Sequence, residues 1–316
     1  MMKIQKSIYV LCGLLALPSL LWAQVKSDTL LSMVPQTHQF FHLQVPAGEL
    51  FLRSSNECGI STTRLHSVNN EAQFDVQQKT DDNGNFHRHL TLSAPGLTPK
   101  SASTTASTST LRLSDGISTL NAYDNPDQIR SEIQIDPNLS TDLFLHQGVG
   151  ASRLDLSGLS LTSLTIKSAF SDIMLNYGTA NQVQMQKMEI HSTRGDVIIK
   201  HPELAMAHHI VIQNDMGTTK LVLGDRAFPH TNITVHSGTG SCVLMVDKEH
   251  PTLIIVKAGM FADEEIGGSF DEISEGVYAN ESLRTHCGGE AESPCQHSTT
   301  VTCDLDLGTL TVMENR

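Results

Sequence analysis

Five versions of one strand decide the fold of this chain: Leu143-Phe-Leu-His-Gln, Leu164-Thr-Ile-Lys-Ser, Met188-Glu-Ile-His-Ser, Ile210-Val-Ile-Gln-Asn and Ile233-Thr-Val-His-Ser. Apolar and polar residues alternate in each version. A turn and a second, apolar strand follow every time, and we call the two strands the first and second halves of a repeat. The turns lie at Gly150, Ser171, Gly195, Gly217 and Gly240.

The spacing of these copies is regular. Successive copies start 21, 24, 22 and 23 residues apart, and the turns are separated by the same numbers. Such a period is typical of a solenoid, because a single unit cannot bury its apolar face and needs neighbours above and below. The sequence therefore predicts an all-β, solenoid-like stack of parallel coils, with repeats of about 22–24 residues.

An antiparallel meander of hairpins is the alternative architecture. In a stack of parallel coils, Ile190 lies beside Ile166 and Ile212. In a meander, each first half pairs with its own second half instead. The neighbours of Ile190 therefore decide between the two.

The N-terminus has the composition of a secretory signal peptide. Lys3 and Lys6 precede an apolar run that ends at Trp22. We expect residues 1–23 to be removed and the protein to be exported to the periplasm or the cell surface. Retention as an anchor is the alternative, because Leu21 is large for its place before the cleavage point. No second apolar run of spanning length follows, so no membrane span is expected in the mature chain.

Composition divides the rest of the chain into three expected parts. Residues 24–97 form a small β module, in which residues 37–53 resemble an outlying copy of the repeat. Residues 82–85 (Asp-Asn-Gly-Asn) predict a hairpin in the same module. Residues 98–110 are nearly all Ser, Thr and Ala and are expected to form a linker. Residues 111–316 form the repeat domain.

The C-terminal part of the repeat domain departs from the pattern. Between Lys257 and Arg284 every charged residue is acidic. The alternating Asp/Asn spacing of a calcium-binding loop is absent, so we expect a solvated acidic loop. The stretch 301–312 returns to strand, glycine and strand and is expected to form the closing coil.

The charge of the chain limits its partners. The formal net charge is -13, and it becomes -15 when the signal peptide leaves with Lys3 and Lys6. Nucleic acids and anionic lipid surfaces both require clustered basic residues. We therefore expect no nucleic-acid partner.

Five cysteines remain in the mature chain, so at least one thiol is unpaired. Cys287 and Cys295 flank a Gly-rich loop that could close into a disulfide. Cys242 and Cys303 lie inside apolar strand patterns, and we expect them to be small buried side chains.

Catalytic and metal-binding motifs are missing. The sequence has no nucleophile elbow, paired-histidine zinc helix, Cys-x-x-Cys or phosphate loop. His286 and His297, next to the two loop cysteines, are the best metal candidates, but the disulfide competes for the same thiols. We expect no metal, no cofactor and no enzymatic activity.

Histidine recurs at one position of the first halves. His146, His191 and His236 lie two repeats apart, with Lys167 and Gln213 between them. Coils rise by about 4.8 Å, so these histidines are about 10 Å apart and cannot share a zinc ion. The pattern predicts an exposed polar ladder.

The second halves are apolar on both faces: Ile173-Met-Leu, Val197-Ile-Ile, Leu221-Val-Leu and Val243-Leu-Met. One face lines the core, and the other presents a column that we assign to Met174, Ile198, Val222 and Leu244. Burying each such side chain is worth roughly 1.5–3 kcal/mol, so something should cover the column. The candidates are residues 24–97 or 258–283 of the chain itself, a protein partner or a second copy.

These residues also resemble a known family. Gly148-Val-Gly150-Ala-Ser-Arg-Leu-Asp-Leu-Ser-Gly-Leu-Ser-Leu, with Ile135-Asp-Pro-Asn-Leu-Ser-Thr-Asp-Leu before it, resembles the toastrack and LiaF-type C-terminal domains of bacterial cell-envelope proteins. The resemblance covers about residues 131–312. It implies an exported all-β solenoid-like domain, usually non-enzymatic and often associated with envelope stress or adhesion.

The expected function is that of an exported, non-enzymatic structural or interaction protein of the cell envelope. One alternative is a small-ligand-binding periplasmic protein, but a core filled by Leu, Ile and Val leaves no pocket. The other is a hydrolase whose nucleophile and base meet only in the fold.

Overall fold

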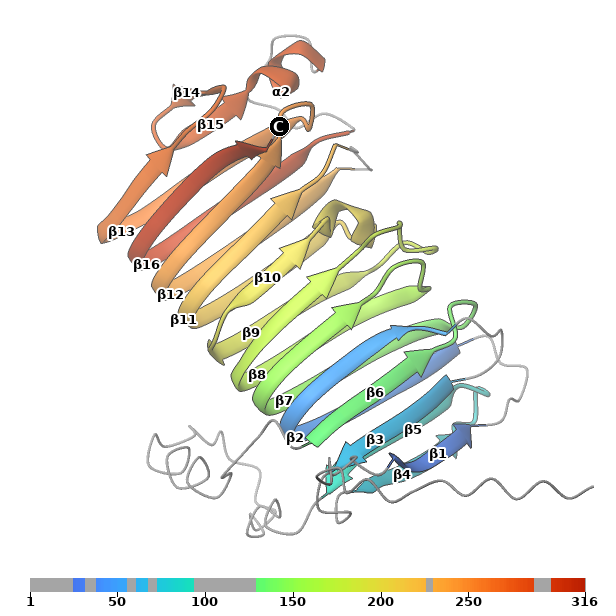
Figure 1. Cartoon of the computed structure of the whole chain (residues 1–316). Coiled ribbons are helices and arrows are strands. Elements are labelled where there is room, and N and C mark those ends of the chain that lie inside the picture. Colours follow the sequence, from blue (N-terminus) through green and yellow to red (C-terminus); the bar gives the residue numbers. More distant parts are fainter. Residues whose placement is uncertain are drawn as a thin grey trace, which may run out of the picture.

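Each repeat folds as one coil, because its turn bends a single long strand so that the two halves face each other (Figure 1). The computed structural model describes residues 25–31, 38–55, 61–67, 73–93, 129–225, 230–286 and 297–315. Along the stack the coils are β2 (His38–Ser54), β7 (Ser140–Asp155), β8 (Leu161–Asn176), β9 with β10 (Lys187–Arg194 and Val197–Lys200), β11 (His209–Leu223), β12 (Thr231–Asp247), β16 (Thr299–Asn315) and β13 (Thr252–Ile266).

The coils are parallel and in register. Ile190 pairs with Ile166 on one side and with Ile212 on the other. The solenoid prediction is therefore confirmed, and the meander is wrong. The same register places the bend residues above one another, with Gly48 beside Gly150 and Gly240 beside Gly308.

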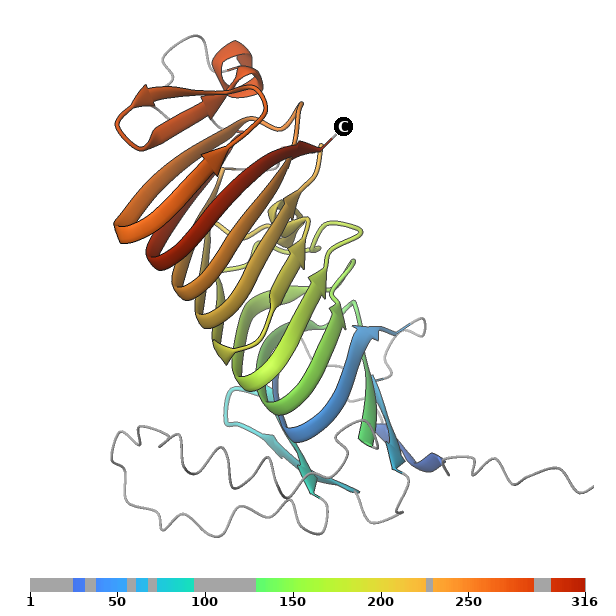
Figure 2. The same cartoon turned by 60° about the vertical axis from the view of Figure 1, so that its left-hand side comes forward.

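The bends form one edge of the stack (Figure 2). Glycine is required there for two reasons that are clearest at Gly240. Its φ is 156°, in the region that side chains rarely adopt, and a Cβ on it would lie 1.9 Å from the carbonyl oxygen of Gly217 in the coil below. Successive backbones therefore approach closely at the bend.

The core fills the space between the two halves of every coil. In the first half of β8, Leu164 and Ile166 point inward, and in the second half Ile173 and Leu175 do so. All four are buried, and the cluster that they belong to extends over the whole stack. Alternation in the first halves thus leaves one face polar and in contact with solvent.

At the N-terminal end, β2 is inserted between β7 and β6 (Ile129–Ile135), although β6 and β7 are neighbours in sequence. Residues 38–54 are therefore a true coil of the repeat, so the coils extend beyond the expected 111–316 range. The expected linker, 98–110, lies outside the described residues. The other strands at this end are β1 (Val25–Leu31), β3 (Ser61–Ser67), β4 (Gln73–Thr80) and β5 (Phe86–Ser93); β4 and β5 form the predicted hairpin.

At the C-terminal end, β16 is inserted between β12 and β13. The prediction that residues 301–312 form the closing coil is therefore wrong, because β13 lies beyond them. Strand β13 is followed by β14 (Phe270–Ser274), β15 (Val277–Asn280) and the short helix α2 (Glu281–His286).

The acidic segment 258–283 is not a loop. Its first part is the second half of β13, and Asp263 pairs with Thr309 of β16. Asp263 and Glu265 remain exposed, as expected of acidic side chains, because this half of β13 is the last of the stack. Glu264, on the inward side of this half, is exposed as well, and its Oε1 accepts a hydrogen bond of 3.0 Å from the Tyr278 hydroxyl.

Candidate functional site

The outer surface of the second halves, which we call the outer face, is the part of the stack with the most unusual chemistry. Side chains alternate from the bend onward, so the second and fourth residues after it enter the core and the third and fifth point outward. The third residues form one column, in which Met174 pairs with Ile198 and Ile198 pairs with Lys220. From β2 to β16 this column is Phe51, Arg153, Met174, Ile198, Lys220, Val243 and Thr311.

The structure corrects the column assigned from the sequence. Met174 and Ile198 are direct neighbours, as expected. Val222 also faces outward, but it belongs to the column of fifth residues, beside Lys200 and Met245. Leu244 is fully buried in the core. A shift of two residues keeps a side chain on its face, whereas the shift of one made at Leu244 moves it to the opposite face.

A signal for the correct register was present in the sequence. The bend glycines are stacked, so counting three residues from each one identifies the true column. Counting from the first apolar residue fails in β11 and β12. There the second residues after the bend are Thr219 and Cys242, which are buried but were not read as the start of an apolar run.

The outer face carries an apolar strip in its centre. Met174 is 39% exposed and Met313 is 42% exposed, while Ile198, Val243 and Met245 are partly exposed. In the described residues, 258–283 joins the end of the stack rather than crossing this strip. The apolar strip continues directly into a pocket at the N-terminal end.

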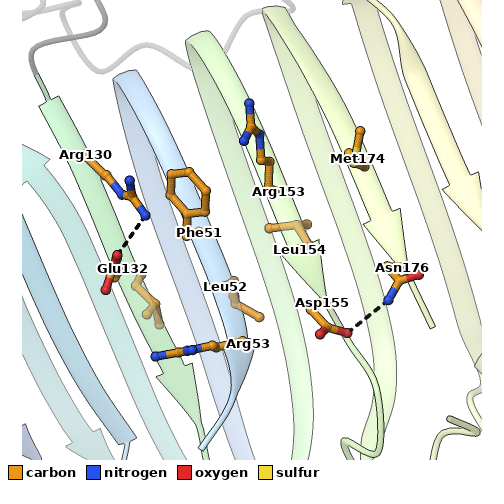
Figure 3. Close-up of a pocket in the computed structure, with 11 residues that line it drawn as sticks. Phe51, Leu52, Arg53, Arg130, Glu132, Arg153, Leu154, Asp155, Met174 and Asn176 are labelled. Carbon is orange, nitrogen blue, oxygen red and sulfur yellow. Dashed lines mark hydrogen bonds and ion pairs between the residues drawn. The ribbon is translucent and has the colours of Figure 1, made fainter. Parts of the chain in front are cut away.

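This pocket surrounds Phe51 and has a volume of about 330 Å³ (Figure 3). Leu52 and Leu154, whose side chains enter the core, also line it. Arg130 of β6 and Arg153 of β7 lie on the two sides of the Phe51 ring, with guanidinium carbons 4.0 Å and 5.5 Å from its centre. Both distances are within the range of cation–π attraction.

The three arginines of the pocket differ in their partners. Arg130 Nη2 lies 3.0 Å from Glu132 Oε1 and is therefore neutralised. Within the described part of the chain, Arg53 and Arg153 form no ion pair. Asp155, also in the lining, instead accepts hydrogen bonds from Ser157 and Asn176. Two guanidinium groups thus remain available in a chain whose net charge is -13.

The opposite surface, on the first halves, carries the predicted polar ladder. His146 pairs with Lys167, Lys167 with His191, and Gln213 with both His191 and His236. The ladder is confirmed. Burial first, and then the charge of Lys167, lowers the pKa of His146.

A second group of histidines lies at the N-terminal end of this surface. The rings of His42 and His89 are stacked, with centres 4.4 Å apart, and Phe40 stacks on His87 at 4.5 Å. Burial and the neighbouring His89 lower the pKa of His42. No group of three or more metal-binding side chains in a suitable arrangement occurs in the described residues.

The buried thiols are placed as expected. Cys242 and Cys303 are fully buried, and their Sγ atoms lie 3.9 Å apart across the core. Cys287 and Cys295, the expected disulfide pair, lie outside the described residues.

Glu203 is among the buried polar groups that sequence reasoning missed. It lies where β10 turns through the 3-10 helix η2 (Pro202–Ala205) towards β11. Glu203 is buried there, and its Oε1 accepts from the Gly224 amide at 3.0 Å. Burial raises the pKa of Glu203. A single Glu after Pro gives no periodic signal, so nothing in the sequence distinguished it.

The profile of a known protein family matches part of the sequence. Residues 69–200 match the profile of the N-terminal domain of toast_rack, DUF2154. These residues belong to the toast-rack family. The toast-rack match ends with β10, whereas the resemblance seen in the sequence runs over 131–312, so the two share 131–200. The coils beyond β10 continue the same bend and register.

No curated protein matches the sequence. A crystal structure described as a candidate cell adhesion protein from Clostridium sporogenes ATCC 15579 is 13% identical, with a TM-score of 0.47, and the alignment covers 92% of this chain and 100% of that one. Another, described as a candidate adhesin from Bacteroides fragilis NCTC 9343, is 10% identical, with a TM-score of 0.33 and coverage of 91% and 98%. Neither similarity assigns an activity to this chain.

Proposed function

We propose that the protein is an exported, non-enzymatic component of the cell envelope that binds another protein chain through its outer face. The observation that carries this proposal is the apolar strip, which begins at Met174 and Ile198, passes Val222 beside Lys220 in β11, and continues at Val243 and Met245. Apolar side chains in contact with water on a long sheet face favour association, because covering them removes their area from solvent.

Export is supported by the N-terminal composition and by the envelope context that the toast-rack resemblance implies. No helix of the described residues is long and apolar enough to cross a membrane. Cell fractionation followed by N-terminal sequencing of the purified protein tests this part. We expect a mature N-terminus at residue 24 in the envelope fraction, and a variant lacking residues 2–23 should remain in the cytoplasm.

The contact face is tested by Ile198→Glu, which places a charge in the centre of the strip without entering the core. Gln213→Glu on the polar ladder is the matched control, since it adds the same charge to the opposite surface. Chemical cross-linking in intact cells should yield a cross-linked species with the natural protein and the control but not with Ile198→Glu. Equal cross-linking of all three would contradict the proposal.

Binding of a small ligand is the second candidate function, and the pocket around Phe51 is the observation that favours it. The core remains filled, as expected, but a cavity exists outside it. The residues that line this cavity determine which class of ligand could bind there.

A further inference from the structure

We propose that the pocket around Phe51 binds a carboxylate side chain of an acidic and apolar segment of a partner protein, with Arg153 and Arg53 as the cationic groups. This inference rests on the proposed contact face, because pocket and strip are continuous through Met174. It adds the chemistry of the partner, which the apolar strip alone does not define.

The first step is the charge of the ligand. Arg153 is exposed, has no carboxylate partner among the described residues, and contacts the Phe51 ring. The ring holds the guanidinium in place without neutralising it, so less side-chain entropy is lost when an anion binds. An anionic group is therefore the natural occupant.

The second step distinguishes a single carboxylate from a polyanion. Glu132 and Asp155 also line the cavity, and the whole chain is strongly acidic. Several phosphates in a row would be repelled by these groups, whereas one carboxylate fits the fork of an arginine. Nucleic acids and other polyphosphates are therefore disfavoured here.

The third step concerns the rest of the ligand. Met174 stands next to Arg153 in the column and Ile198 next to Met174, with coils about 4.8 Å apart. A ligand that uses both the guanidinium and the strip must extend over about 10 Å. A peptide segment with an acidic residue followed by apolar residues meets this requirement, while a small free acid reaches only the pocket.

Selection from a displayed random-peptide library against the full mature chain tests the inference. We expect the enriched peptides to share an Asp or Glu next to apolar residues. One enriched peptide, labelled with a fluorophore, would then be titrated against the variants. Arg153→Gln should weaken binding about 10- to 100-fold, the loss expected for a hydrogen-bonded charge.

Arg153→Lys should give an intermediate loss, because it keeps the charge but not the fork. Arg194→Gln, an exposed arginine at a bend outside the pocket, is the matched control and should bind normally. Thermal melting of each variant verifies that it folds. Raised salt should weaken binding to the natural chain more than to Arg153→Gln.

Failure of this inference is distinguishable from failure of the contact face. Enriched peptides that lack an acidic residue, or that bind Arg153→Gln normally yet lose binding to Ile198→Glu, would overturn the carboxylate site and leave the contact face in place. Peptides indifferent to both variants, or no enrichment, would overturn it as well. Butyrate alone competing as well as the peptide would assign the pocket to small acids instead.

Discussion

His250 is an ionisable residue whose imidazole ring is buried away from water. The side chain is fully buried, and its Nε2 lies 2.8 Å from Thr299 Oγ1. Burial lowers its pKa to about 4, although Asp247 and Asp225 act in the opposite direction. Glu203 is the reverse case, because burial raises the pKa of its carboxyl group. Single residues therefore link the stability of this stack to pH with opposite signs.

For His250 the expected effect appears on acidification. Between pH 6.5 and about 4 the ring takes up a proton in the unfolded chain but not in the folded one, so the free energy of unfolding falls as pH decreases. The loss attributable to this ring approaches about 3 kcal/mol. Urea unfolding at several pH values, compared with His250→Gln, measures it. Parallel pH profiles for the two proteins would contradict this assignment.

The two core thiols provide a prediction about reactivity. The hydrogen bond with Cys242, and then burial, raise the pKa of Cys303, and neither side chain is accessible to solvent. Because the thiolate is the reactive form, iodoacetamide should leave both unmodified in the folded protein and modify both in denaturant. Mass spectrometry of the peptides measures this. Rapid labelling of either thiol under native conditions would show that the core opens.

At the scale of the element, the bend is what turns a long strand into a coil. Its glycines combine a positive φ with a close backbone oxygen from the neighbouring coil, so both the conformation and the space exclude a side chain. Gly84 in the β4–β5 hairpin has a positive φ of 82°, but a Cβ added to it would have no atom within 4 Å. Substitution of Gly84 therefore measures backbone strain alone, whereas substitution of a bend glycine measures backbone strain and steric crowding together.

Gly84→Ala should cost only the conformational strain, about 1–2 kcal/mol. Gly240→Ala should lower the free energy of unfolding by about 1–3 kcal/mol more than Gly84→Ala does. The added Cβ would collide with the Gly217 carbonyl oxygen, so the backbone of β11 or of β12 must also shift. Chemical unfolding of both variants compares them. Equal losses would mean that the coils can separate at the bend without a penalty.

The same element explains what the sequence could and could not predict. Period, strand halves and parallel register follow from local patterns, because each coil repeats the alternation of its neighbour. The exact outward column did not follow from apolar content, since Thr219 and Cys242 take core positions that apolar residues fill in β8 and β10. The pocket was missed because its residues come from β6, β2, β7 and β8, which only the stack brings together.

At the scale of the whole molecule, each end of the stack contains a coil inserted between two strands from a different part of the chain. Strand β2 lies between β6 and β7, and β16 lies between β12 and β13. No sequence pattern predicts this order, because a coil with this register can stack on any other coil. For a related reason, the sequence did not predict that the acidic segment contains the second half of β13. A strand at the end of a stack packs against fewer neighbours, so it needs fewer apolar side chains.

Val301→Asp tests the importance of the inserted strand. Val301 is buried in the first half of β16, between β12 and β13, so an unpaired carboxylate there should destabilise that end strongly. Stability in stacked repeats is carried by nearest neighbours, so amide exchange should accelerate in β12 and β13 and remain slow in β7 and β8. Thr302→Asp, one residue away on the outward side, is the control. Uniform acceleration through all coils would show that the stack unfolds as one unit.

The position of β16 also has a consequence for synthesis. Strand β16 leaves the ribosome after β12 and β13, and it must enter between these two strands made earlier. Until residue 299 and those after it emerge, β12 and β13 lack the neighbour they share, and their backbone edges can pair with other chains. A chain that terminates before β16 therefore keeps unpaired strand edges, which chaperones and proteases recognise. The strand order thus exposes an incomplete protein to removal.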